Sequence, residues 1–411
     1  MRLVPLAALL LLAAPLAAQP TAVDSARAAW LAPHVVPLDG LLADPASAAG
    51  GPFLDAVRGA RVVALGEPTH GDGAAFAVRA ALTRLLHERG GAETLALEAS
   101  GLTDALPLTS PAEALARIDS VASFAWASAE EARAGLAYAA STAGSPRPLR
   151  VVGLDVTPQT GGAAAWDRVE RALAGAGALD GRWPEVRRVL GAYSRFQRPA
   201  VPDALRAEIE GAVADYRAAL GGAGDEEAGL VLGGFLAAAA QFWAQRSAPR
   251  DRQMGENLAY LARQTAAPLV VWAASSHAVR RLAAVDNLDP AWSYDDAVTM
   301  GDAASAALGD GYRAVAFTAC GGAWGAAPLG LPVEAIPPPS PGGLEALVCA
   351  APFETAAFLD VGALAQTEAG AWLNAPLLAR PLGYAEMRAG WPLVLDGLVV
   401  VRTTAPATAV E

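Results

Sequence analysis

The sequence predicts an α/β fold in which a central, mostly parallel β-sheet is flanked by helices and carries a large helical insertion. The first observation is a set of short apolar runs separated by segments of helical periodicity, a pattern typical of parallel sheets. These runs are 62–67, 94–98, 150–155, 269–274, 312–318 and 397–401. The second observation is that residues from about 162 to 265 show helical patterns with few strand signals, which indicates the insertion.

The N-terminus has the features of a secretory signal peptide. A charged start is followed by an apolar stretch and then by small residues before Gln19. We therefore expect a signal peptide at 1–18 and a secreted or periplasmic protein, with an uncleaved N-terminal anchor as the alternative. The next residues, 19–60, are interpreted as an N-terminal lead-in, and 61–411 as the α/β domain.

The net charge of the chain restricts the class of partner. A formal charge of -12 over 411 residues, without any basic run, argues against nucleic acid and against anionic membrane surfaces. The apolar stretch 228–244 contains several glycines and is of borderline length, so we interpret it as a buried helix. We expect a small-molecule substrate, no nucleic acid and no membrane contact after signal removal. The oligomeric state is left open.

The run 62–67 ends in the most informative loop of the chain. In this loop Glu67 and His70 lie between Gly66 and Gly71. The two glycines could take positive φ and so turn both side chains toward one cleft. A strand end with chance polar residues is the alternative for this segment alone. Later runs also end in polar groups, namely Glu98, Asp155 and the segment Ser275-Ser276-His277. Because ligands bind at the carboxyl ends of strands in open α/β sheets, these endings favour a shared site.

A helix is predicted immediately after this loop. Asp72 can cap a helix over about 73–88, with Arg79 some two turns inside it. Helical side chains lean toward the N-terminus of their helix. We therefore expect Arg79 to reach back to the mouth of the His70 loop.

Several enzyme classes are disfavoured because their sequence motifs are absent. The sequence contains no GxSxG elbow, HExxH motif, phosphate-binding loop, dinucleotide glycine fingerprint or paired CxxC. The remaining candidates are Glu67, His70, Arg79, Glu98 and His277. A histidine can take a proton from water, a carboxylate can hold its ring, and a cation can stabilise a developing oxyanion. The hypothesis that follows is hydrolysis of an acyl bond.

These residues also lie in a series of motifs that resembles the erythromycin esterase-like family. The resemblance runs from about residue 62 to 404 and includes Gly66-Glu67-Pro68-Thr69-His70-Gly71, Arg79, Leu97-Glu98-Ala99, Arg250-Asp251-Arg252, Val271-Trp272-Ala273 before His277, and Met300-Gly301. It implies a metal-independent hydrolase with His70 as the general base on water. It also implies that Glu67 and Glu98 orient that base and that Arg79 and His277 serve the substrate or the oxyanion.

The chain departs from the family pattern at three positions. Ala274 and Ser275 stand where the family usually has histidine and asparagine, and Pro68 stands where a small residue is commoner. These departures leave the substrate open, from simple esters to macrolide-like lactones. We predict that Asp155, Arg250, Arg252 and Ser275 contribute to substrate binding.

We expect neither a metal nor a cofactor, but two other functions stay open. Glu67, His70, Glu98 and His277 could bind a catalytic metal ion, although the positive charge of Arg79 would repel it. The second alternative is a non-catalytic small-molecule-binding protein, because the departures before His277 could accompany a loss of turnover.

The chain has two cysteines, Cys320 and Cys349. In an exported protein they could form one disulfide, and two buried free thiols are an equal alternative that the spacing does not decide. Neither lies in a CxxC motif or beside a histidine, so we assign them no redox or nucleophilic role.

Overall fold

A computed structural model of the chain describes residues 21–44, 47–102, 110–122, 124–156, 162–289, 293–326 and 330–410. The predicted signal peptide at 1–18 lies outside these residues, so the secreted or periplasmic location stays a prediction.

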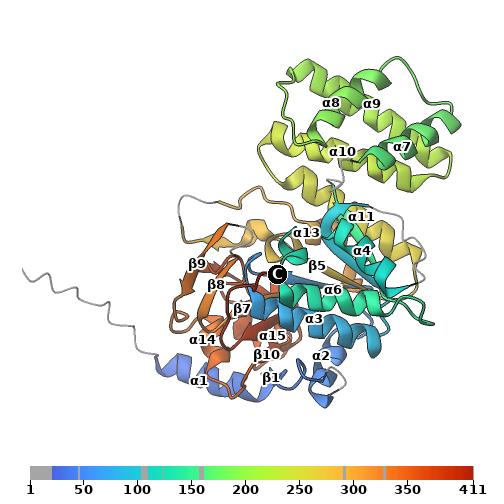
Figure 1. Cartoon of the computed structure of the whole chain (residues 1–411). Coiled ribbons are helices and arrows are strands. Elements are labelled where there is room, and N and C mark those ends of the chain that lie inside the picture. The colour runs from blue at the N-terminus through green and yellow to red at the C-terminus, as the bar shows by residue number, and fades with distance from the viewer. Residues whose placement is uncertain are drawn as a thin grey trace, which may run out of the picture.

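The predicted fold class is confirmed, because a sheet of eight mostly parallel strands lies between helices (Figure 1). The strand order is β1-β10-β13-β7-β2-β5-β3-β4. Six neighbouring strands run parallel, and all six were predicted: β13 (Gly397–Val401), β7 (Tyr312–Ala319), β2 (Val62–Glu67), β5 (Leu269–Ala274), β3 (Thr94–Gly101) and β4 (Arg150–Asp155). The two antiparallel edge strands, β1 (Val36–Pro37) and β10 (Ala356–Leu359), were not predicted because two to four residues carry no clear period.

The central strands read as unbroken apolar runs because both faces of the sheet are covered. Every residue of β2 is buried. Val63 and Leu65 of β2 belong to a core with α3 (Gly73–Glu88) and α6 (Glu130–Ser141). Val62 and Ala64 face the opposite core, which α13 (Met300–Leu308) helps to form.

The predicted insertion contains five helices: α7 (Ala163–Gly175), α8 (Trp183–Tyr193), α9 (Asp203–Gly222), α10 (Glu226–Ala244) and α11 (Ala248–Gln264). Figure 1 shows α7 to α10 as a lobe above the sheet, and α11 leads back to the sheet. The lobe has its own core, in which the rings of Trp166 and Phe235 stack with centroids 3.7 Å apart. Among the described helices, α10 alone is long and apolar enough to span a membrane, but more than half of it is buried inside this protein.

The C-terminal third adds two small sheets beside the main one. A hairpin pairs β8 (Gly322–Ala326) with β9 (Leu331–Ile336), and a three-stranded sheet contains β11 (Leu377–Ala379), β12 (Met387–Ala389) and β6 (Asp286–Asn287). The hairpin, which lies beside β7 in Figure 1, shares a core with Val315 and Phe317 of β7. The three-stranded sheet shares a core with Ala316, on the other face of that strand.

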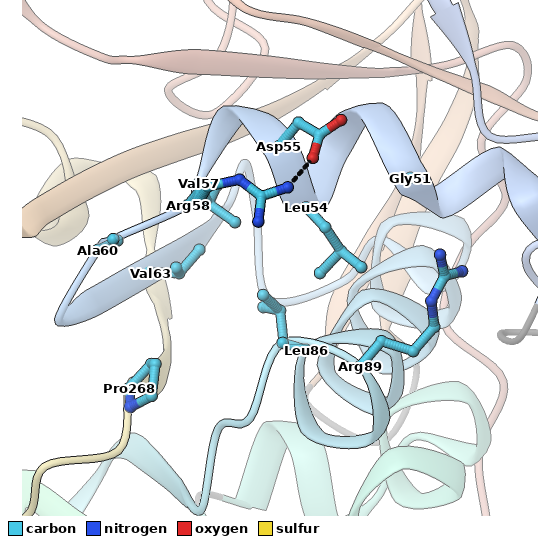
Figure 2. A pocket seen from close by; sticks show the side chains of 12 residues that line it. Gly51, Leu54, Asp55, Val57, Arg58, Ala60, Val63, Leu86, Arg89 and Pro268 are labelled. Atoms are coloured by element: carbon cyan, nitrogen blue, oxygen red, sulfur yellow. Dashed lines mark hydrogen bonds and ion pairs between the residues drawn. The ribbon is translucent and has the colours of Figure 1, made fainter.

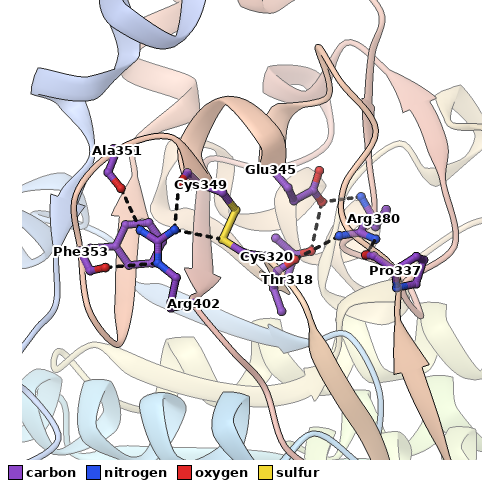
Figure 3. The surroundings of a disulfide bond; sticks show 10 residues. Thr318, Cys320, Pro337, Glu345, Cys349, Ala351, Phe353, Arg380 and Arg402 are labelled. Carbon is purple, nitrogen blue, oxygen red and sulfur yellow. Dashed lines mark hydrogen bonds between the residues drawn. A yellow bond between two sulfur atoms is a disulfide. The ribbon is translucent and has the colours of Figure 1, made fainter. Parts of the chain in front are cut away.

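A disulfide between Cys320 and Cys349 joins the end of β7 to α14 (Leu344–Cys349), so the disulfide alternative is the one observed (Figure 3). Arg402 braces the same region by donating to the carbonyl groups of Cys349 (2.7 Å) and Ala351 (2.8 Å). The bond closes a chain segment of 29 residues.

Next to the disulfide lies a buried polar cluster. The Glu345 carboxylate accepts hydrogen bonds from the Thr318 hydroxyl (3.0 Å) and from the backbone N–H of Arg380 (2.5 Å). The Arg380 guanidinium donates to the carbonyl groups of Pro337 and Ala319. This cluster therefore ties α14 to the chain segment that follows β11 (Figure 3).

Candidate active site

Glu67 and His70 lie at the carboxyl end of β2 and contact each other directly. Glu67 is buried, and its Oε1 accepts a hydrogen bond from His70 Nδ1 at 2.5 Å. The His70 side chain is 47% exposed, and no other hydrogen bond to its ring is found in the described part of the chain. The Nε2 atom of His70 is therefore available to water or to a substrate.

Gly66 and Gly71 were expected to take positive φ, and this expectation is wrong. Both glycines instead allow another chain segment to pack directly against their backbone. Neither glycine has a positive φ. A Cβ at Gly66 would lie 2.8 Å from the Ser275 Cα, and one at Gly71 would lie 2.8 Å from the Gly325 backbone. The two positions therefore need glycine because other chain segments pass directly over them.

The segment after β11 supports the same loop from the outside. The backbone N–H of Gly383 donates to the Pro68 carbonyl at 3.0 Å, and the Tyr384 hydroxyl donates to Asp72. Asp72 also accepts from Ala75 N at 2.8 Å and so caps α3 as predicted. Contacts from a region some 300 residues away therefore fix the loop that carries His70.

Arg79 lies behind the Glu67 carboxylate instead of at the mouth of the cleft. Its Nη1 is 2.5 Å from Glu67 Oε2, and the residue is fully buried. The guanidinium lies 4.5 Å from the ring centre of Trp272 and 5.0 Å from that of Trp126. The indole N–H of Trp126 also donates to Glu67 Oε2 at 2.9 Å. Arg79 thus holds Glu67 from inside the core and does not lie at the mouth of the His70 loop.

The environment of His70 favours its protonated form. Burial alone would lower the pKa of the imidazole, but the hydrogen bond and negative charge of Glu67, together with the charge of Glu98, outweigh burial and raise the pKa to about 9. At neutral pH most molecules therefore carry a proton on both ring nitrogens of His70. The ring can accept a proton only in the minor neutral form.

Glu98 begins a second cluster at the ends of β3 and β5. Its carboxylate accepts from Arg250 Nη2 at 2.8 Å and from Ala274 N at 2.7 Å. Arg250 also binds Asp155 at the end of β4 through two hydrogen bonds of 2.8 and 2.7 Å. Although burial opposes it, the positive charges of His277, Arg250 and His70 lower the pKa of Glu98 to about 2. Glu98 is therefore ionised at all physiological pH values.

His277 lies between two carboxylates in the same cluster. Its Nδ1 is 2.6 Å from Asp251 Oδ1, and its Nε2 is 3.3 Å from Glu98 Oε1. Arg250 Nη1 approaches the same Nε2 at 3.3 Å. Burial alone would lower the pKa of His277, but the charges of Glu98 and Asp251 raise it above the ordinary value. The site therefore contains two carboxylate–imidazole pairs, Glu67–His70 and Asp251–His277.

The remaining predicted residues have different surroundings. The buried Ser275 hydroxyl donates to the Gly66 carbonyl at 2.8 Å and so joins α12 (Ser275–Ala278) to β2. Arg252 is exposed on α11 and makes no contact with the cluster among the described residues. Asp155 and Arg250 are brought together with Glu98, as described above.

Two contributors, Asp251 and Trp126, were not among the residues predicted for the site. Asp251 was part of the Arg250-Asp251-Arg252 motif, but a helical sequence does not reveal which neighbour faces the site. Trp126 is completely buried. A buried indole N–H needs an acceptor, which is the signal that could have pointed to it.

A cavity of about 580 Å³ opens beside the second pair. Asp251, Ser276, His277, Leu282 and Tyr294 are among the residues that line it. Another cavity, of about 330 Å³, lies far from these residues near Leu54, Val63, Leu86 and Pro268 (Figure 2). Val63 and Pro268 lie at the amino ends of β2 and β5, whereas both imidazoles lie at the carboxyl ends. Of these two cavities, only the one of about 580 Å³ borders an imidazole of the site, that of His277, and His70 is not among its lining residues.

The donor set does not suit a metal ion. No group of three or more His, Cys, Asp or Glu side chains with metal-binding geometry is found among the described residues. Glu67 is already paired with Arg79, and Glu98 with Arg250. A bound cation at either carboxylate would lie beside a fixed guanidinium.

Comparisons with known proteins agree with this architecture. The family model for erythromycin esterase matches residues 136–404. A solved protein from Bacillus cereus is similar over 94% of this chain and 99% of its own, with a TM-score of 0.70 and 15% identity. A succinoglycan biosynthesis protein is similar over 95% and 99%, with a TM-score of 0.70 and 16% identity.

A further solved structure is a histidine-to-asparagine mutant of an erythromycin esterase in its open conformation. It is similar over 92% of this chain and 99% of its own, with a TM-score of 0.60 and 19% identity. No curated protein sequence matches. Since the family model covers well over half of the sequence, this chain belongs to the erythromycin esterase family.

Proposed function

We propose that this protein hydrolyses a carboxylic ester or lactone with His70 as the general base on water. The observation that carries the proposal is the Glu67–His70 pair at the carboxyl edge of the sheet, with the ring half exposed and its Nδ1 held at 2.5 Å by a buried carboxylate. Family membership supports hydrolase activity at the level of the family.

In the proposed reaction, neutral His70 takes a proton from water at Nε2. Its Nδ1–H stays hydrogen-bonded to the Glu67 carboxylate. The resulting hydroxide attacks the substrate carbonyl carbon, and the negative charge moves to the carbonyl oxygen. The C–O bond to the leaving group then breaks, and the His70 imidazolium returns the proton to the departing alkoxide. The cationic groups His277 and Arg250 at the second pair would stabilise the oxyanion.

The substrate class remains to be identified by experiment. The cavity beside His277 is about 580 Å³, which is within the usual size range for small-molecule sites. We propose esters and lactones as the class, with macrolide lactones among the members to be tested.

We also propose that the protein is exported, in agreement with the N-terminal pattern at 1–18. The disulfide between Cys320 and Cys349 supports this, because such bonds persist in oxidising compartments. Fractionation of producing cells, with N-terminal sequencing of the mature chain, tests export. Recovery of the uncleaved chain in the cytoplasm would contradict it.

The test of the activity is a hydrolysis screen of simple esters, small lactones and erythromycin with the mature protein. His70→Ala is expected to lower kcat/KM by about 10²- to 10⁴-fold, the usual range for a general base. The matched control is His34→Ala, because His34 is also exposed and contacts the ring of Trp30. A rate unchanged by His70→Ala, with circular dichroism showing an intact fold, contradicts the role of His70.

A further inference from the structure

We propose that Asp251 is a positioning residue that fixes His277 with a proton on Nδ1, so that its Nε2–H is directed to the reacting oxygen. This inference deepens the function proposed above and rests on it for its catalytic meaning. The position of the ring itself can be tested without any substrate.

The geometry of Asp251 favours this role. The residue is 1% exposed, and its Oδ1 lies 2.6 Å from His277 Nδ1. The same oxygen accepts the backbone N–H of Met300 at 3.1 Å, at the first turn of α13. Asp251 is thus held from two helices, because α11 supplies its backbone and α13 supplies a donor. A carboxylate fixed in this way allows His277 few orientations.

The opposite ring nitrogen shows what this orientation provides. His277 Nε2 lies 3.3 Å from Glu98 Oε1 and borders the 580 Å³ cavity through its side chain. Glu98 is shared, because it also accepts from Arg250 Nη2 and from Ala274 N. Its contact with His277 is also the longer of the two carboxylate contacts. Asp251 therefore sets the ring, and a substrate oxygen would compete with Glu98 for the Nε2–H.

The two carboxylates at the ring nitrogens favour a doubly protonated imidazole, whereas the Arg250 guanidinium, 3.3 Å from Nε2, opposes it. α11 supplies Asp251 and Arg250, β3 supplies Glu98, and Arg246, Asp295 and Asp296 are further charged residues that line the cavity. Arg246 is paired with Asp296 at 2.7 Å. A carboxylate lies at each ring nitrogen and can accept one N–H. A neutral tautomer has only one N–H, so it can donate to only one of the two carboxylates.

The variant that isolates this contact is Asp251→Asn. The asparagine oxygen can still accept from Met300 N, so α13 keeps its contact, whereas the loss of the negative charge weakens the hold on the Nδ1 proton of His277. The matched control is Glu256→Gln, the same chemical change on the same helix at a surface ion pair with Arg217.

The experiment records ¹⁵N and ¹H resonances of the histidine rings in the full-length mature protein. The chain has only four histidines, so single substitutions of His34, His70 and His87 assign the spectrum. In the wild type we expect protons on both nitrogens of His277 at pH 7. In Asp251→Asn we expect the Nδ1 proton to be lost or to exchange rapidly and the ring to titrate at lower pH, while Glu256→Gln leaves the spectrum unchanged.

Kinetics on any ester found in the screen complete the test. Asp251→Asn should lower kcat by about 10²-fold with little change in KM, as is typical when a donor to the oxyanion loses its position. A wild-type His277 without a proton on Nδ1, or an unaltered His277 spectrum in folded Asp251→Asn, overturns the inference. If no ester is hydrolysed, the proposed function fails and the NMR result still decides the role of Asp251. If Asp251→Asn does not fold, the wild-type spectrum alone decides it.

Discussion

The two carboxylate–imidazole pairs of the site differ in how much of each imidazole ring is available. The His70 side chain is 47% exposed, and its partner Glu67 holds a single ring nitrogen. The His277 side chain is 13% exposed, and carboxylates face both of its nitrogens. A ring with one open nitrogen can exchange a proton with water, whereas a ring with carboxylates at both nitrogens is fixed in orientation. Two histidines at the same edge of the sheet therefore differ in their access to water and in their freedom to turn.

The supports of the two pairs also differ. A buried cation, a buried indole and the Gly383 segment hold the first pair. Consecutive residues of α11 hold the second pair, because Arg250 binds Glu98 and Asp251 binds His277. Changes in one set of supports should therefore leave the other pair in place, and this expectation can be tested.

The largest effect is expected from Arg79→Met, which removes the buried cation of the first pair. Breaking a buried ion pair from one side typically costs roughly 3–5 kcal/mol, because the remaining charge stays uncompensated. We expect a loss of this size in the free energy of unfolding, measured by urea titration. The control is Arg133→Met, which breaks the surface ion pair with Asp119 and should cost about 1 kcal/mol or less. Equal losses in both variants would contradict the assigned role of Arg79.

The next effect concerns the disulfide, which is linked to the first pair through α14 and the segment after β11. Replacing both cysteines by serine releases a segment of 29 residues, and chain entropy predicts a loss of roughly 3–4 kcal/mol. The loosened region includes Glu345 and Arg380, which precede the Gly383–Pro68 contact. We expect the ring resonances of His70 to broaden while those of His277 stay sharp. Equal broadening of both rings would show that the supports are not separate.

A smaller effect is expected from pH, and it also separates the two rings. Because His70 must be neutral to act as a base, kcat/KM should rise with pH until about pH 9, the raised pKa of His70. Glu98 has a pKa of about 2 and is ionised over this whole pH range, so its titration does not contribute to the pH dependence of kcat/KM. Glu67→Gln should lower the pKa of His70 and move the rise to lower pH, with a lower maximal rate. A rise centred near pH 6.5 in the wild type would contradict the pairing with Glu67.

The same raised pKa links His70 to stability. The folded state binds the His70 proton more tightly than the unfolded state, so the stabilisation is fully present below about pH 6.5 and is lost as pH rises through about 9. Half exposure of the ring keeps this contribution small. Unfolding titrations of the wild type and His70→Ala at both pH values measure the difference.

The smallest effects are expected at two residues that the sequence had placed in the substrate site. Ser275→Ala removes a buried hydrogen bond to the Gly66 carbonyl, which should cost about 1–3 kcal/mol because a buried acceptor is left unpaired. Arg252→Ala changes an exposed side chain and should leave both stability and KM unchanged. A large rise in KM for Arg252→Ala would show that the substrate extends over α11.

The sequence predicted the parts of this structure that depend on local patterns. The six parallel strands and the capped helix α3 follow from apolar runs and from Asp72, and the structure has them within a few residues of the predicted bounds. The convergence of Glu67, Glu98 and Asp155 at one edge followed from the rule that parallel strands end together.

The parts that depend on distant contacts could not be predicted in this way. Nothing near Arg79 in the sequence indicates that Trp126 and Trp272 surround its guanidinium. The role of Asp251 depends on the rotation of α11 relative to β5, which the packing of the whole domain sets. Gly66 was recognised as important, but its reason is the passage of Ser275 above it.

The hydrogen atom that serves as the side chain of Gly66 sets how near the two imidazoles can come. Strand β2 carries His70 beyond its end and β5 carries His277, and the strands pair directly at Gly66 and Ala273. A methyl group at residue 66 would clash with Ser275, because its carbon would lie 2.8 Å from the Ser275 Cα. One added carbon would thus tilt α12 away from β2. The spacing of the two imidazoles therefore depends on a residue that contacts neither of them.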